Sequence, residues 1–196
     1  MIFSSRLPAE NRSAIIDKIN QVSSHLGIEP SWLMAVINFE TAGTFSTSIQ
    51  NPHTGATGLI QFMPSTAQGL GTSTEELAQM SFIRQLDFVQ RYYAPYKGKV
   101  KSFVDLYLAT FWPAAIGKSD DYVLESSRVS AATIARQNPI FDPLKRGYVT
   151  VGSIKTALLL KTPAEYAKEL VTSNGGTFAI LAGSIITIIL IKNLFS

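Results

Sequence analysis

The sequence predicts an all-α fold that ends in a single hydrophobic helix. Apolar residues recur at helical spacing through much of residues 1–171, and no stretch of useful length alternates between apolar and polar residues as a strand would. Residues 177–195 are far more apolar than the rest of the chain. With 46% hydrophobic and 16% charged residues, the composition excludes a disordered protein.

Prolines and capping residues mark the starts of the predicted helices, and glycines mark their ends. Gly27 ends the first helix, Pro30 lies in the first turn of the second, and Ser73 with Glu76 forms a capping box. A polar, Gly- and Pro-containing stretch over residues 44–57 predicts a loop. The predicted helices cover residues 8–26, 31–41, a short segment from 64, a segment from 73, 82–93, 102–111, 131–137, 153–161 and a last helix to about 171.

The C-terminal run predicts a membrane span. Residues 177–195 read TFAILAGSIITIILIKNLF, with Lys192 as the only charge, and as a helix they would be roughly 28 Å long. The alternative is a buried core helix. We therefore divide the chain into a helical domain with a helical extension at 1–171, a linker at 172–176 and a transmembrane helix at 177–195.

Two further features concern the membrane. Ala179, Gly183 and Thr187 form a stripe of small residues that would permit self-association of the span. The N-terminus lacks the apolar stretch that a secretory signal needs.

The composition also limits cofactors and partners. There is no cysteine and there are only two histidines, so we expect no disulfide, thiol nucleophile, metal or cofactor. A net charge of +3 is too small to indicate nucleic acid as a partner. The small basic cluster of Lys97, Lys99 and Lys101 is typical of a solvated turn; the alternative is attraction to an anionic cell-wall polymer or to lipid headgroups.

Glu40 is the strongest catalytic candidate. It ends a predicted apolar helix and is flanked by Ile37, Phe39 and Phe45. Both the negative end of the helix dipole and an apolar pocket disfavour an ionised carboxyl, so its pKa should be raised as a general acid requires. Taken alone, it could also be an ordinary glutamate at a helix end.

The segment after Glu40 carries a specific resemblance. Glu40-Thr41 is followed by a polar loop and then, over residues 55–67, by GATGLIQFMPSTA. This pattern resembles the soluble lytic transglycosylases, relatives of goose-type lysozyme, and so implies a lysozyme-like helical domain. Residues 106–117, LYLATFWPAAIG, resemble the version found in phage-borne members, which implies a virion-associated subtype.

The resemblance implies a reaction and a catalyst. Enzymes of this family cut the β-1,4 bond between N-acetylmuramic acid and N-acetylglucosamine in peptidoglycan and leave a 1,6-anhydro product. Glu40 would act first as acid and then as base, without a second carboxylate. Asp87, Asp105 and Asp142 have no motif that supports such a second role.

Four residues are predicted to bind the glycan. Gln61 offers both a donor and an acceptor, although it could instead anchor the loop; Met63 offers an apolar surface, although it could instead pack in the core. Thr54 is the nearest match to a serine expected in the loop. Tyr107 lies one helical turn before Phe111, which stands where the family has a tyrosine, and so would replace the missing hydroxyl.

We expect the neighbours of these residues to form part of the same surface. Gly55 and Gly58 would let a sugar chain approach the backbone, and Phe62 would add apolar surface for sugar faces.

A later loop departs from its family counterpart. Residues 138–150 resemble a calcium loop, but only Asp142 and Gly147 match the required pattern. We expect no calcium there, with Arg146 filling the space of the ion.

Together these features predict a membrane-anchored lytic transglycosylase. Its partners would be peptidoglycan strands, the membrane and virion proteins or a second copy. It would be a single-pass protein of a virion membrane that acts in the host periplasm or cell envelope. The alternatives are a hydrolytic goose-type lysozyme and a non-catalytic structural membrane protein of the virion.

Overall fold

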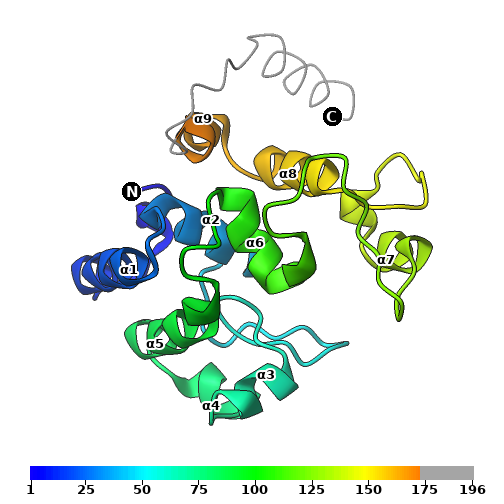
Figure 1. Cartoon of the computed structure of the whole chain (residues 1–196). Helices are drawn as coiled ribbons and strands as arrows, with labels where there is room; N and C mark the ends of the chain where they lie inside the picture. The colour runs from blue at the N-terminus through cyan, green and yellow to red at the C-terminus, as the bar shows by residue number, and fades with distance from the viewer. Residues whose placement is uncertain (173–196) are drawn as a thin grey trace.

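The computed structural model describes the backbone of residues 1–172 and, apart from residues 168, 169, 171 and 172, their side chains (Figure 1). This part of the chain is helical and contains no strand, only isolated bridges such as that between Thr57 and Phe62. The all-α prediction is therefore confirmed for the described residues. The helices are α1 Arg12–Leu26, α2 Pro30–Glu40, α3 Pro64–Gly69, α4 Thr74–Gln79, α5 Phe82–Tyr93, α6 Phe103–Phe111, α7 Ala131–Gln137, α8 Val151–Leu160 and α9 Ala164–Thr172, with short 3-10 turns η1 Ser4–Arg6, η2 Ala94–Tyr96, η3 Pro113–Ala115 and η4 Pro139–Phe141.

Two predicted helix starts were wrong by two residues or more, each for a local reason. The first helix begins at Arg12 rather than residue 8, because the preceding chain forms η1 and the Arg12 side chain donates to the Leu7 carbonyl at 3.1 Å. The helix predicted from residue 153 begins at Val151, because Thr150 is its N-cap and accepts a hydrogen bond from the Ser153 N–H at 3.1 Å. The bounds predicted for α5 and α7 are confirmed.

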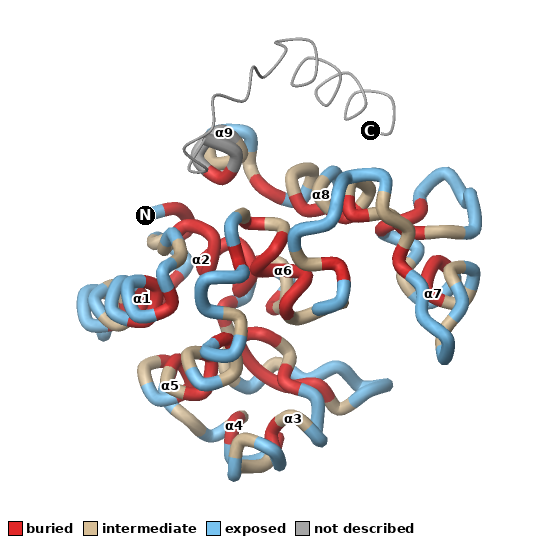
Figure 2. Tube along the Cα trace, viewed as in Figure 1, coloured by how far each residue is buried: buried red, intermediate tan, exposed pale blue. Residues whose placement is uncertain are grey.

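Helix α2 forms the centre of the core. Residues 31–38 are all buried, because the helix is apolar on nearly every side and packs against α1, α6 and α9. Figure 2 shows buried backbone along α2 and α6 and a largely exposed outer face on α1. The C-terminal end of this central helix carries Glu40, so the core fixes the backbone of the catalytic candidate.

No helix within residues 1–172 is long and apolar enough to cross a bilayer. The predicted span at 177–195, its stripe of small residues and all but the first residue of the predicted linker lie outside the described residues.

Candidate active site

The turn after Glu40 is held by the side chain of Thr41. This buried hydroxyl donates to the Ile37 carbonyl at 2.7 Å and accepts from the Phe45 N–H at 3.0 Å. The chain then reverses at Gly43, whose φ of 80° lies in the left-handed region. The residue directly after the candidate acid therefore ties the helix end to the start of the following loop.

The environment of Glu40 keeps its carboxyl neutral. The residue is only partly exposed, and desolvation by burial raises its pKa from 4.5 to about 8. At pH 7 the carboxyl is therefore mostly protonated, as the apolar flanks in the sequence predict. The residue as a whole lies at the boundary of the core, while its carboxyl is desolvated.

Three tyrosines lie close enough to Glu40 to sense its charge. Tyr92 and Tyr93 come from the end of α5 and Tyr107 comes from α6. Burial is the main cause that raises the pKa of each phenol, to about 12 for Tyr92, and a negative charge on Glu40 raises all three further. The Tyr92 hydroxyl donates to the Ala109 carbonyl at 3.1 Å. Two helices thus bring phenol groups to the end of α2.

An aromatic cluster extends from the same helix end. The Phe39 and Tyr107 ring centroids are 5.2 Å apart, and Phe111 stacks on Tyr107 at 5.9 Å with an interplanar angle of 26°. Phe141 from η4 contacts all three rings. Tyr107 is only 4% exposed, so its ring is not an open surface for a sugar. Any contribution of Tyr107 to substrate binding would have to come through its hydroxyl.

The loop between α2 and α3 is attached to α5 by one buried side chain, Gln85. The Gln85 oxygen accepts from the Leu59 N–H at 2.6 Å, and the Gln85 nitrogen donates to the carbonyls of Thr47 at 3.0 Å and Leu77 at 2.7 Å. Gly58 has a φ of 82°, and a Cβ there would collide with the Gln85 side chain. The expectation that Gly58 leaves room for a sugar was wrong, because the group that approaches its backbone is Gln85.

Two of the predicted glycan-binding residues have bonds within the loop. The Gln61 side-chain nitrogen donates to the carbonyls of Ile49 at 3.3 Å and Gly58 at 3.2 Å, as the loop-anchoring alternative requires. The Thr54 side chain is exposed, and its hydroxyl accepts from the Ala56 N–H at 3.3 Å. The hydrogen bonds of both side chains stay within the loop, and their roles in binding stay predictions.

Met63 and Phe62 face opposite ways. Met63 is 45% exposed, so the alternative that it packs in the core was wrong. Phe62 is 2% exposed and packs edge-on against Tyr92, with the ring centroids 6.1 Å apart. The expectation that Phe62 offers a surface to sugars was therefore wrong as well. Met63 alone of this pair is available at the surface.

The three aspartates considered as second carboxylates have structural partners. Asp105 and Asp142 are buried and accept hydrogen bonds from backbone N–H groups, and Asp87 is in ion pairs. Their partners are Lys18 at 2.6 Å and Arg84 at 3.2 Å for Asp87, Lys101 N and Gly117 N for Asp105, and Arg146 N and Gly147 N for Asp142. These bonds account for the three groups without a catalytic role.

The loop that resembles a calcium site is closed by its own residues. Besides the two backbone N–H groups, the Arg146 guanidinium Nε lies 3.8 Å from the Asp142 carboxylate. The basic side chain therefore contacts the carboxylate that would otherwise be a cation ligand. The absence of calcium remains a prediction.

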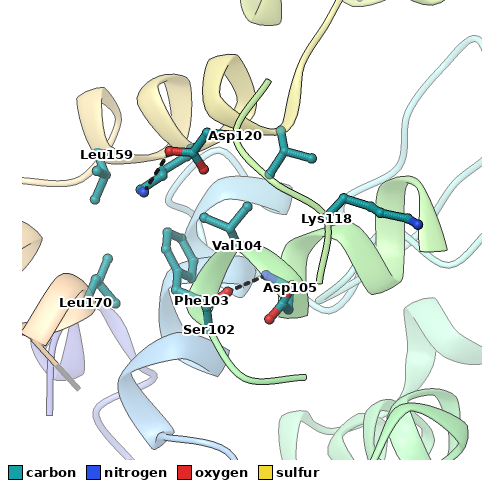
Figure 3. Close-up of a pocket in the computed structure, with 10 residues that line it drawn as sticks. Ser102, Phe103, Val104, Asp105, Lys118, Asp120, Leu159 and Leu170 are labelled. Carbon is teal, nitrogen blue, oxygen red and sulfur yellow. Dashed lines mark hydrogen bonds and ion pairs between the residues drawn. The ribbon is translucent and has the colours of Figure 1, made fainter. Parts of the chain in front are cut away.

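A cavity of about 190 Å³ lies beside α6, with Asp105 in its wall. Figure 3 shows it between α6, α8 and α9, beside the Lys155–Asp120 ion pair of 3.2 Å. Phe103, Leu159 and Leu170 contribute to its apolar wall, and no predicted site residue lines it. We assign it no part in the chemistry at Glu40.

Sequence reasoning missed Gln85, Tyr92 and Tyr93. The adjacent aromatic pair at the end of an amphipathic helix was visible in the sequence, but its approach to Glu40 depends on how α5 packs. The available signal for Gln85 was a glutamine on the side of α5 where the helical pattern otherwise places apolar residues.

One of three comparisons with known proteins finds a match, and it lies in the first half of the chain. Searches of curated proteins and of solved structures find no match. Residues 17–85, a segment that contains Glu40 and ends at Gln85, match the family model of the transglycosylase SLT domain, which belongs to the lysozyme-like superfamily.

Proposed function

We propose that this chain is a peptidoglycan lytic transglycosylase in which Glu40 is the single acid–base catalyst. The matched SLT domain supports the reaction class and the peptidoglycan substrate. The observation that carries the catalytic assignment is the raised pKa of Glu40, about 8, at the end of α2 within the matched segment. An acid that is protonated at neutral pH is what cleavage of a glycosidic bond needs.

The first step transfers one proton. The Glu40 carboxyl protonates the glycosidic oxygen between N-acetylmuramic acid and N-acetylglucosamine, the C1–O bond breaks, and the bonding electrons leave with that oxygen. Glu40 is then a carboxylate. Its desolvated surroundings, which raise the pKa, make this carboxylate a stronger base than one in water.

The second step returns the proton. The Glu40 carboxylate takes the proton of the muramyl C6 hydroxyl while the C6 oxygen bonds to C1. This closes the 1,6-anhydro ring and restores the neutral acid, so no water is consumed. Ordinary retaining and inverting glycosidases need a second carboxylate for the nucleophile or for activating water. A ring-closing hydroxyl on the substrate removes that need.

We also assign the glycan-binding residues. The exposed Met63 side chain is available to pack on a sugar face, and the exposed Thr54 can reach a ring hydroxyl. Gln61 retains its side-chain oxygen as an acceptor, since its hydrogen bonds to the Ile49 and Gly58 carbonyls use the side-chain nitrogen. The Tyr107 hydroxyl is proposed to orient the substrate beside Glu40, in place of the hydroxyl that Phe111 lacks.

Mass spectrometry of the products tests this function. Purified sacculi digested with the full-length protein should release 1,6-anhydromuropeptides. Reducing muropeptides, each heavier by one water, would contradict the proposal and favour the hydrolytic goose-type lysozyme. Failure to release any product would favour a non-catalytic structural protein.

Finally, we propose that residues 177–195 anchor the enzyme in a virion membrane, from which it opens the peptidoglycan of the host envelope. The support is the apolar run and the resemblance of residues 106–117 to phage-borne members. Extraction of the full chain from membranes should need detergent rather than alkaline carbonate. Release by carbonate alone would contradict the anchor, and absence of the protein from purified virions would contradict the virion assignment.

A further inference from the structure

A cavity of about 470 Å³ adjoins the helix end that carries Glu40. Its wall includes Asn38 and Phe39 from the last turn of α2 and Ala42 and Gly43 from the turn that follows, so it is built from residues on both sides of Glu40 in the chain. The remaining wall comes from η1, η4 and the residue after α8. Glu40 itself is not in the wall, but the wall contains residues within two positions of it on either side, unlike the wall of the cavity in Figure 3.

Arg6 is exposed and contacts its neighbours at this cavity. Its Nη1 donates to the Asn38 side-chain oxygen at 2.8 Å, and its guanidinium lies over the Phe3 ring, 5.2 Å from the centroid. A Cβ on Gly43 would collide with Nη1, so the glycine makes room for the guanidinium. All three contacts are with uncharged groups and therefore hold the arginine without neutralising it.

A second cation lines the same cavity. Lys161 is exposed and directly follows α8. The residues that line the cavity include no aspartate or glutamate, and no ion pair joins Arg6 or Lys161 to a described carboxylate. The described wall therefore presents two positive charges and no compensating negative charge. Such a site favours an anionic ligand, and an arginine fork is well suited to a carboxylate.

We propose that this cavity binds the carboxylates of the peptide stem on the muramic acid next to the cleaved bond. The inference rests on the proposed function. The peptide stem of peptidoglycan hangs from the lactyl group of the same sugar whose C1 is attacked, and it carries free carboxylates. A glycan placed with C1 at Glu40 brings the stem close to the end of α2. Arg6 and Lys161 would therefore make the enzyme prefer peptide-bearing glycan.

The test compares two substrates from one preparation of sacculi. One is glycan with its peptide stems, and the other is the same glycan after an amidase has removed them. For the full-length protein, kcat/KM should be higher on the peptide-bearing strands, and Lys161→Gln should lower the ratio of the two values by about 5-fold. Arg6→Gln should lower it by about 10-fold or more. Arg136→Gln, which removes an exposed cation on α7, should leave the ratio unchanged.

The Arg6 variant could lose activity through misfolding, because its side chain is part of the local packing. Lys161→Gln, at an exposed position, keeps the test decisive. An unchanged ratio in Lys161→Gln, or an equal loss on both substrates, would overturn the inference.

A binding measurement separates this inference from the proposed function. Isothermal titration of the full chain with isolated stem peptide should show binding that weakens with salt and falls about 5-fold in Lys161→Gln. Binding of this kind by a protein that cleaves no glycan would overturn the proposed function and keep the cavity assignment. Absence of binding, or an affinity for the stem peptide that is unchanged in Lys161→Gln, would overturn the cavity assignment even if cleavage occurs.

Discussion

The side-chain oxygen of Gln85 accepts a hydrogen bond of 2.6 Å from the backbone N–H of Leu59, across 26 residues of sequence. This bond attaches the loop that follows Glu40 to α5, the helix that also delivers Tyr92 and Tyr93 toward the Glu40 carboxyl. The loop and the tyrosines are therefore positioned by one helix. Changes on the buried side of α5 should affect both parts of the site.

Gln85→Leu should destabilise the protein and impair catalysis. The substitution leaves the Leu59 N–H and the Thr47 and Leu77 carbonyls without their partner, which should cost about 3 kcal/mol in the free energy of unfolding. Urea unfolding measures the loss. Gln90→Leu, on the same helix at a partly exposed position, is the control. A Gln85→Leu protein as stable as this control would contradict the role of the buried amide.

Activity should fall as pH rises through about 8. The first step needs a protonated Glu40, and its pKa of about 8 means that the acid form is lost above that value rather than above 4.5. The measurement is kcat/KM on sacculi between pH 5 and 10, with the folded state followed by circular dichroism. A profile already falling between pH 4 and 6 would show that Glu40 titrates as an ordinary glutamate.

Glu40→Gln should stabilise the folded protein at alkaline pH. Because the folded pKa is raised, the unfolded state releases a proton between about pH 4.5 and pH 8 while the folded state retains it, and stability falls over this window. The glutamine variant lacks this proton release. Its free energy of unfolding should match the wild type near pH 4 and exceed it at pH 8.5, by up to about 5 kcal/mol. Equal pH dependence in the two proteins would contradict the desolvated carboxyl.

Tyr107→Phe should lower turnover without unfolding the protein. The ring stays in the aromatic cluster with Phe39 and Phe111, and only the hydroxyl near Glu40 is lost. We expect kcat to fall by about 10-fold, with a change in unfolding free energy below about 1 kcal/mol. Tyr122→Phe, outside the site, serves as the comparison. Wild-type turnover in Tyr107→Phe would show that this hydroxyl does not replace the one that Phe111 lacks.

Local signals in the sequence were enough to predict several elements. The capping box of Ser73 and Glu76 is present, and α5 and α7 have the predicted bounds. Each of these depends on residues within one or two helical turns, which the sequence displays directly. The raised pKa of Glu40 was also predictable, because the apolar residues that desolvate it include its neighbours in the chain.

Long-range packing accounts for what sequence reasoning missed. Gln85 contacts Thr47 across 38 residues, and no periodicity reveals such a pair. The same limit explains Gly58, whose missing side chain makes room for Gln85 rather than for a ligand. It also explains Phe62, which is buried against Tyr92 while the adjacent Met63 is exposed. Which of two adjacent apolar residues faces inward depends on the loop conformation, which follows no regular period.

Turnover of purified sacculi by Glu40→Gln tests the central claim most directly. Glutamine keeps the size of the side chain but has no proton to give the glycosidic oxygen, so the rate of anhydromuropeptide release should fall by about 10³-fold or more. Glu10→Gln, an exposed glutamate at the N-terminal side of α1, should retain the wild-type rate. A folded Glu40→Gln protein that releases anhydromuropeptides within 10-fold of the wild-type rate, about 1.4 kcal/mol in barrier height, would contradict the assignment of Glu40 as the acid–base catalyst.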